Sequence, residues 1–468
     1  MSERVELGAA SNRASETSLD LNELARSVEQ TLDRVAVGER AAVLTWPVPR
    51  VPGERLLAAA NDGDALFWAQ PGEAEVCALG AAFSLSASGG ERFQTIQRRA
   101  SEIWPTLEFS AADPAAPEPR FFGGFAFQAG QAKSALWQDF GDARFVLPRL
   151  SYLKNNDGAW LRLIVRPNQL VGAERAMLLE LVSRALYALF GSAPAAPPAR
   201  EVSREEGSAH AWANLVSAIQ DEIAAGRAQK IVAARRLGLR LDRELLPSLV
   251  LARLRSDAPE STRFAVRVGT STFLGATPER LLQKRGNELA TEAVAGSIDT
   301  DGAGSATRLL ESSKDIREHE FVVREILRLL EPLTSELSPG KREVHRLRTV
   351  LHLRTPIRAR LRAASHVLEL VAKLHPTPAV GGVPTRAAID FISAHEPDER
   401  GWYAGPVGWF DAAGDGRFVV ALRSGLVSGN RAELYAGAGI VEDSNAPSEF
   451  AETRWKLAAL LGALGVSG

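Results

Sequence analysis

Three apolar segments near the C-terminus, WYAGPVGWF (402–410), RFVVALRSGLV (417–427) and AELYAGAGIV (432–441), decide the fold class. Two short turn sequences separate them, DAAGDG at 411–416 and SGN at 428–430. Strand-like runs joined by short turns rich in Gly, Asp and Asn are typical of antiparallel hairpins. The segments therefore predict an antiparallel meander. Because helices and strands follow in mixed order elsewhere, we expect an α+β fold rather than a doubly wound parallel sheet.

Outside the meander, helical and strand-like patterns occur without a repeat. The expected helices are 173–190, 211–229, 312–330 and 448–464, and the clearest expected strands are 120–128, 144–154 and 230–241. A connector rich in Pro, Ala and charged residues, 191–208, is either a domain boundary or a surface loop inside one large domain. We therefore divide the chain into an N-terminal part, 1–207, and a second region, 208–468.

Composition excludes several classes of function. The chain has 468 residues, of which 45% are hydrophobic and 24% charged, and its net charge of −2 gives no surplus for binding nucleic acid or an anionic membrane. The single cysteine, Cys77, excludes an internal disulfide and suits a reducing compartment. The first residues lack a signal-peptide core, and no run approaches the ~18 apolar residues of a membrane span. We expect a cytoplasmic protein with no nucleic-acid or membrane partner.

The segment HPTPAVGG at 375–382 places two prolines and two glycines between apolar runs. Neither a helix nor a central strand accommodates that spacing. We therefore expect an ordered turn of small residues that forms the wall of a cavity.

Glu318 is a candidate for the site in that cavity. On the expected helix, Val322, Ile326 and Leu329 form an apolar stripe, and Glu318 lies one turn before Val322. A carboxylate at the edge of a buried face needs a cation or a basic partner. The plainer explanation is an acid that the helix dipole favours near the helix start.

The last helix carries three charged residues on one face, Glu449, Glu452 and Lys456, at steps of three and four. They form either a surface Glu-to-Lys pair that stabilises the helix by a few tenths of a kcal/mol, or a metal-binding carboxylate beside an anion-binding lysine.

Strands supply further candidates. Period-two alternation places Arg423 on the face of Val419 and Ala421, where it either binds a ligand carboxylate or extends to the sheet edge. Lys230 opens an expected strand and Glu279 follows a Thr-Pro turn. These two residues are either a base and an opposing acid or solvated charges.

The segment YAGAGIVED at 435–443 contains Gly437 and Gly439 but lacks the third glycine and the following helix of a dinucleotide site. Close backbone approach to a ligand explains these glycines better.

Ten segments, taken in order, resemble the chorismate-utilising enzymes, and most closely the isochorismate synthases. They are KIVAARR, FLGATPERLL, TEAVAGS, SSKDIREHEFVV, LHLRTP, LHPTPAVGGVP, YAGPVGWF, VVALRSG, YAGAGIVEDS and EFAETRWK, within residues 208–462. The first 200 residues match weakly. The resemblance implies a single large domain of two packed antiparallel β-sheets flanked by helices, in which 208–468 form the chorismate-binding catalytic region.

The resemblance also implies roles. Glu318 and Glu452 would bind Mg²⁺. Lys230 would be the general base that activates water for addition at C2, and Glu279 the general acid that protonates the leaving C4 hydroxyl, so that chorismate isomerises to isochorismate. The residues expected to bind chorismate are Gly296, Ser297, His352, Ala379, Arg423, Gly437, Gly439 and Lys456.

Two positions separate this chain from its relatives. The resemblance places a threonine of anthranilate and salicylate synthases, which eliminate pyruvate, where this chain has Ala379, and anthranilate synthases also lack the lysine found here at Lys230. The alternatives are a salicylate synthase, an aminodeoxychorismate synthase component that would need ammonia and a glutaminase, and a catalytically silent chorismate binder. We expect a monomer without an obligatory glutaminase subunit, whose product would supply menaquinone, a catechol siderophore or salicylate.

Overall fold

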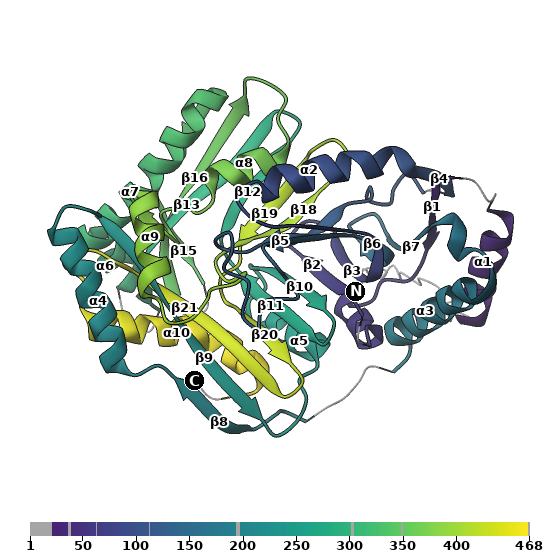
Figure 1. Cartoon of the computed structure of the whole chain (residues 1–468), viewed down its shortest axis with the longest axis horizontal. Helices are drawn as coiled ribbons and strands as arrows, with labels where there is room; N and C mark the ends of the chain where they lie inside the picture. Colours follow the sequence, from purple (N-terminus) through teal and green to yellow (C-terminus); the bar gives the residue numbers. More distant parts are fainter. Residues whose placement is uncertain are drawn as a thin grey trace, which may run out of the picture.

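The computed structural model describes residues 21–466 apart from 36–38, 62, 112, 193–196, 301–303 and 348–349. Its frame consists of two sheets that share one long strand, β6 (Ala143–Lys154) (Figure 1). In the first sheet β6 pairs with β3 (Glu75–Ala87) and β7 (Ala159–Val165), and in the second it pairs with β5 (Phe121–Phe125). The predicted fold class, one α+β unit of two sheets flanked by helices, is confirmed.

Strands from distant parts of the sequence alternate in both sheets. The first sheet has the order β4 (Leu107–Ala111), β1 (Ala41–Pro47), β7, β6, β3, β2 (Ala65–Ala69), β10 (Thr262–Val268), β11 (Ser271–Thr277), β20 (Ser424–Ser428), β21 (Arg431–Ile440) and β9 (Lys230–Leu241), with β8 (Glu201–Glu206) and β17 (Gly382–Val383) beside β9. The second has the order β6, β5, β18 (Pro406–Phe410), β19 (Gly416–Val420), β12 (Arg280–Arg285), β13 (Glu288–Asp299) and β16 (Val350–Leu361), with β14 (Thr334–Pro339) and β15 (Glu343–Arg346) beside β16. Among the described strands β1 and β4 are parallel, and the other pairs are antiparallel.

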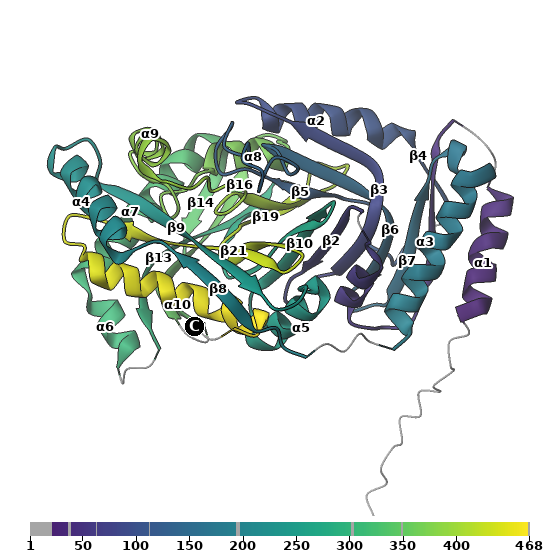
Figure 2. The ribbon, with the colours of Figure 1, turned by 60° about the horizontal axis from the view of Figure 1, so that its bottom comes forward.

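The helices lie outside the sheets, on opposite sides of the molecule (Figure 2). One group packs against the outer face of the first sheet and shares a hydrophobic core with it. It comprises α3 (Gly172–Phe190), α5 (Pro247–Asp257) and α10 (Ala446–Leu464). Another group comprises α2 (Arg92–Ile103), α7 (Ser313–Leu330) and α8 (Val367–Leu374). The remaining helices are α1 (Leu21–Arg34), α4 (Ala209–Ala224), α6 (Ser305–Glu311) and α9 (Thr385–His395), with short 3₁₀ turns η1 (Gly53–Ala59), η2 (Trp104–Thr106), η3 (Pro167–Gln169) and η4 (Glu331–Leu333). No helix within the described ranges is both long and apolar enough to cross a bilayer.

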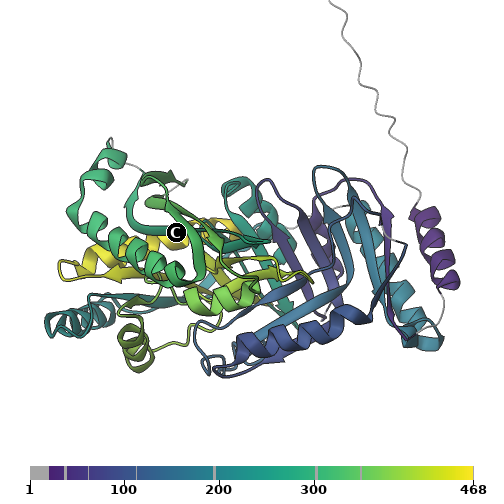
Figure 3. The same ribbon diagram turned by 90° about the horizontal axis from the view of Figure 1, so that it is seen from above.

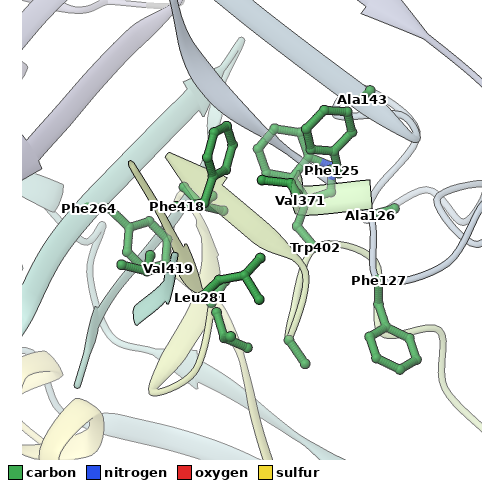
Figure 4. Packing of buried hydrophobic residues seen from close by; sticks show 14 of the residues in the cluster. Phe125, Ala126, Phe127, Ala143, Phe264, Leu281, Val371, Trp402, Phe418 and Val419 are labelled. Atoms are coloured by element: carbon green, nitrogen blue, oxygen red, sulfur yellow. The ribbon is translucent and has the colours of Figure 1, made fainter. Parts of the chain in front are cut away.

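The first sheet is buried on both faces, because successive side chains along its strands point alternately into two hydrophobic cores. In β10, Phe264 and Val266 belong to the core between the sheets, whereas Ala265 belongs to the core under α3, α5 and α10. Successive side chains of a strand point to opposite faces, so a run that is apolar at every position can serve two cores. Figure 4 shows Phe264 in one cluster with Phe418 and Val419 of the second sheet.

The two halves of the sequence occupy opposite ends of the molecule but are not separate in structure (Figure 3). β2 pairs with β10 in the first sheet, and β5 pairs with β18 in the second. The connector 191–208 contains β8, which pairs with β9. Of the two readings of this connector, the structure supports a segment inside one large domain.

The four expected helices and the strand 230–241 are present with small differences at their ends. The helix expected at 211–229 is α4, which ends at Ala224, because Gly226 adopts a φ of +72° and turns the chain toward β9. The segment 375–382 is the expected turn, between α8 and α9.

The prediction of one continuous meander is wrong at its centre. β18 pairs with β19 and β20 pairs with β21, as expected of hairpins, but the run 417–427 is not one strand. β19 ends at Val420 in the second sheet, and β20 begins at Ser424 in the first. Between them Arg423 adopts a φ of +49°, so its side chain does not share the face of Val419 and Ala421. The chain passes from one sheet to the other here, and period-two alternation cannot continue across the break.

Candidate active site

A cavity lies where α7 and α10 meet the inner edges of β9, β13 and β21. Every residue predicted for the site lines it, except Lys230. These lining residues are Glu279, Gly296, Ser297, Glu318, His352, Ala379, Arg423, Gly437, Gly439, Glu452 and Lys456. Residues from eight separate segments of sequence therefore converge on one small volume.

Lys230 reaches the site through an ion pair. As the first residue of β9 it is fully buried, and its Nζ lies 2.9 Å from Oε1 of Glu318 on α7. A buried carboxylate or ammonium is costly unless it is paired. Of the two explanations offered for Glu318, the buried-edge acid with a basic partner is therefore the one that the structure shows.

Gly439 on β21 leaves the space that this pair occupies. A Cβ atom at Gly439 would lie 2.8 Å from Cε of Lys230 and would collide with Oε1 of Glu318. At Gly437 a Cβ atom would lie 2.6 Å from the carbonyl oxygen of Ala233 on β9. The close approach expected at these two glycines is therefore an approach to the chain's own side chains and backbone.

Two more carboxylates of the site pair with lysines. On α10, Oε1 of Glu452 lies 2.6 Å from Nζ of Lys456, and both side chains are largely buried. Oε1 of Glu449 lies 2.6 Å from Nζ of Lys314 on α7. The Glu-to-Lys pair expected on the last helix is therefore present as Glu452 and Lys456, but it lines the cavity and does not lie on the open surface.

The two glutamates of α10 differ in acidity. Burial raises the pKa of Glu449, and the charge of Glu452 raises it further, although Lys314 opposes the shift. Burial also disfavours the charged form of Glu452, but the ion pair with Lys456 outweighs it and lowers the pKa. Glu452 is thus the more acidic of the two glutamates.

Glu279 lies beside the cavity after the end of β11. Its side chain is buried, and burial together with the neighbouring charge of Glu292 raises its pKa to about 8, although Lys230 and Lys456 oppose the shift. At neutral pH this carboxyl group therefore carries a proton that it can donate.

His352, Ser297 and Arg423 form a connected polar group in the cavity lining. His352 of β16 lies opposite Ser297 of β13, with Nδ1 2.9 Å from the Ser297 Oγ. Burial and the charge of Arg423 lower the pKa of His352 well below its usual range. Nη2 of Arg423 lies 3.4 Å from Nε2 of His352. Because a guanidinium only donates, Nε2 accepts, and Nδ1 carries the proton and donates to Ser297.

The turn at 375–382 forms one wall, as predicted, through Ala379 and Val380. Arg400 fixes this wall, since it donates hydrogen bonds of 2.8 Å to the carbonyl oxygens of Val380 and of Val232 on β9. Glu396 pairs with the same guanidinium and accepts a hydrogen bond from the backbone N–H of Ala234. The wall and β9 are therefore held in one arrangement.

Sequence patterns missed several lining residues, among them Arg400 and Tyr403. Tyr403 is buried, stacks on Tyr435 at 5.3 Å between ring centres, and burial raises its pKa to about 12. Both residues precede β18 in a turn, where neither the helical nor the strand period applies. The one available signal was the family-like segment YAGPVGWF, which begins with Tyr403 and follows Arg400 by three residues.

The donor set suits a hard divalent cation. Glu318 and Glu452 present carboxylate oxygens to one cavity, and Mg²⁺ is usually held by one or two carboxylates together with water and substrate oxygens. Within the described ranges, no group of three or more His, Cys, Asp or Glu side chains converges as a metal site. The described residues thus do not supply a full set of protein ligands, as a structural metal site would.

Comparison with known proteins agrees with this geometry. A family model described as chorismate binding enzyme matches residues 30–465. The salicylate biosynthesis isochorismate synthase of Pseudomonas aeruginosa is 38% identical over 414 residues, 86% of this chain and 85% of that protein. Isochorismate synthase MenF of Bacillus subtilis is 34% identical over 86% of this chain and 88% of that protein. The solved structure of the menaquinone-specific isochorismate synthase MenF from Escherichia coli has a TM-score of 0.77 and 26% identity, covering 95% of this chain and 99% of that one.

Proposed function

The chain belongs to the chorismate binding enzyme family, and on that premise we propose that it is an isochorismate synthase that isomerises chorismate to isochorismate. One observation carries the proposal: a buried lysine and a protonated glutamic acid, Lys230 and Glu279, flank a cavity whose wall at Ala379 has no hydroxyl group. Relatives named isochorismate synthase, with 34% and 38% identity over most of the chain, support it.

Lys230 and Glu279 would divide the proton transfers. Lys230 would be the base that takes a proton from a water molecule as the water oxygen bonds to C2 of the ring. Both ring double bonds shift, from C1=C2 to C1=C6 and from C5=C6 to C4=C5, the C4–O bond breaks, and Glu279 gives its proton to the departing hydroxyl group, which leaves as water. One water enters and one leaves, so the product is an isomer of the substrate. The raised pKa of Glu279 keeps it protonated for this step.

Cationic groups on the far side of the cavity would hold the enolpyruvyl carboxylate. Arg423 offers a planar fork that matches a carboxylate, and Lys456 offers a point charge. Tyr403 would add a hydroxyl donor, and the backbone around Gly437 and Gly439 would close that end. Gly296, Ser297 and His352 would line the side of the ring.

Mg²⁺ fits the donor set described above, with Glu318 and Glu452 as its ligands. Bound there, it would neutralise the ring carboxylate of chorismate and fix its position. In the structure each of these glutamates is paired with a lysine, Lys230 or Lys456, so the site's negative charge is balanced by the chain's own ammonium groups.

A salicylate synthase and an aminodeoxychorismate synthase component remain the alternatives within the family. The lack of a hydroxyl group at Ala379 argues against a salicylate synthase. Activity of the chain as a monomer, without a glutaminase subunit, would exclude an aminodeoxychorismate synthase component. We also propose that 208–468 form the catalytic region and that the enzyme acts in the cytoplasm.

Incubation of the purified chain with chorismate and Mg²⁺ tests the proposal. Chromatography should show isochorismate as the product, and a lactate dehydrogenase assay should show little pyruvate. Stoichiometric pyruvate would indicate a salicylate synthase instead. Binding of chorismate without turnover would indicate a silent binder.

A further inference from the structure

Arg400 lines the active-site cavity, but its guanidinium group is bonded to the protein itself. The residue is 2% exposed and lies in the turn before β18. Its Nε donates a hydrogen bond of 2.7 Å to Oε2 of Glu396, and its Nη2 donates to Oε1 of the same carboxylate. Its Nη1 donates to the carbonyl oxygen of Val380 in the cavity wall, and its Nη2 to that of Val232 on β9, both at 2.8 Å.

These contacts leave Arg400 without a fork that could bind a substrate carboxylate. A guanidinium has five N–H groups, and four of them are used in these bonds. Its charge is also balanced, because Glu396 is buried beside it. Arg423 differs, since the hydrogen bond of its guanidinium to a described residue is the 3.4 Å contact with Nε2 of His352. A substrate carboxylate therefore finds open N–H groups at Arg423 and not at Arg400.

The two carbonyl groups that Arg400 joins belong to the cavity wall and to the strand that begins with Lys230. Main-chain hydrogen bonds also join these segments, among them one of 2.9 Å from the N–H of Val232 to the carbonyl oxygen of Gly381. The wall thus keeps backbone ties to β9 if Arg400 is replaced. The planar guanidinium adds a rigid link at Val380, where the wall faces the cavity.

We infer that Arg400 is a positioning residue for the reaction of chorismate, because its guanidinium holds the wall at Val380 at a fixed spacing from β9. The inference rests on the proposed function. The substrate ring, bound beside this wall, is thereby kept in reach of Lys230. Arg400 acts through the two carbonyl groups and not through the substrate carboxylates, which Arg423 binds. Its loss should therefore affect the chemical step more than the binding of chorismate.

The variant Arg400→Lys tests this role. It keeps a positive charge beside Glu396 but replaces the planar fork by one ammonium group, which does not reproduce the parallel hydrogen bonds. The kcat for loss of chorismate should fall about a hundredfold, the effect of a displacement of about 1 Å, while KM stays near the native value. Arg386→Lys is the matched control, because Arg386 also pairs with an acid four residues away, Asp390, but is exposed on α9. It should keep the native kcat.

The same kinetics separate the other roles of Arg400. A raised KM with unchanged kcat would make it a substrate-binding residue, and a lower melting temperature with native kcat and KM would make it a structural one. Either result overturns the inference. The rate is followed as loss of chorismate, so the identity of the product remains a separate test of the proposed function. A native chain that does not consume chorismate would contradict the proposed function itself.

Amide hydrogen exchange gives a measurement that needs no turnover. In Arg400→Lys the amides of 375–383 should exchange about tenfold faster, the effect of losing about one hydrogen bond, while those of β3 and β6 stay as in the native chain. If Arg400→Lys does not fold, Glu396→Gln takes its place. It keeps an acceptor for the N–H of Ala234 but loses the charge that orients Arg400, and the same local change is expected. Unchanged exchange at 375–383, or equally faster exchange throughout the chain, would overturn the inference.

Discussion

Lys230 and Glu318 form a buried ion pair, with Nζ 2.9 Å from Oε1, that joins the first residue of β9 to the second turn of α7. The lysine is the proposed base, and the glutamate is a proposed ligand of Mg²⁺. The pair therefore links the acid–base and metal-binding parts of the site through one contact. Removing either partner leaves a buried charge without its counter-ion, so each variant below needs a melting curve beside its activity.

The metal assignment predicts that Glu318→Gln and Glu452→Gln abolish turnover. An amide keeps the shape of the side chain but loses the charge that holds Mg²⁺ and, through it, the substrate carboxylate. Calorimetric titration with Mg²⁺ should show loss of binding in both variants. Glu320→Gln is the control, because Glu320 is exposed on the same helix, and it should bind Mg²⁺ as the native chain does. Near-native turnover of either site variant at low Mg²⁺ would refute the assignment.

The acid–base assignment predicts that Lys230→Ala and Glu279→Gln each lower kcat about a hundredfold or more. Both variants should still bind chorismate, measured by equilibrium dialysis, because the cationic groups that hold its carboxylates remain. Weaker binding with unchanged kcat would make the two residues binding groups instead.

The raised pKa of Glu279 also fixes the pH dependence. The protonated acid is present below pH about 8 and is lost above it, so kcat should fall as the pH rises through about 8, and Glu279→Gln should lose this limb. The folded chain holds a proton here that the unfolded chain releases above its ordinary pKa of 4.5. The free energy of unfolding that Glu279 contributes is therefore present at low pH and declines between pH 4.5 and about 8.

Gly439→Ala should lower kcat/KM about a hundredfold, because displacement of a reacting group by about 1 Å has an effect of that order. The added Cβ would lie 2.8 Å from Cε of Lys230 and would collide with Glu318, so both groups must shift. Gly462→Ala is a matched control on α10, where a Cβ meets nothing within 4 Å, and it should keep full activity. Equal activity in the two variants would show that the close approach at Gly439 is unimportant.

Ala379→Thr tests the control of the reaction branch. The threonine places a hydroxyl group on the cavity wall, as in the pyruvate-eliminating relatives, and should increase pyruvate relative to isochorismate. Overpacking by two heavy atoms, which costs about 1–3 kcal/mol, is the competing effect, and the melting temperature measures it separately. A stable, active variant that still makes only isochorismate would show that residue 379 does not determine the product.

Much of the fold was predictable because its elements have regular periods. The strand 230–241 and the helices on either side of the cavity show apolar positions at steps of two or of three and four, and the structure places them where these patterns indicate. Glu318 was predictable for the same reason, because its place on α7 follows from the buried position of Val322.

Periodicity failed where the chain leaves a regular element. Arg423 lies at a change of sheet, so alternation from Val419 gave the wrong direction, although its place in the cavity was foreseen from the resemblance. Arg400 and Tyr403 lie in a turn and have no period at all. The pairing of Lys230 with Glu318 joins positions 88 residues apart, and no local pattern contains such a contact.

The most direct test of the account is one incubation of the native chain with chorismate and Mg²⁺ in water enriched in ¹⁸O. Addition of solvent water at C2 and loss of the C4 hydroxyl predict isochorismate that carries one ¹⁸O atom, with little pyruvate, when the mixture is analysed by liquid chromatography and mass spectrometry. Isochorismate without ¹⁸O would contradict the roles of Lys230 and Glu279, and stoichiometric pyruvate would contradict the proposed reaction itself.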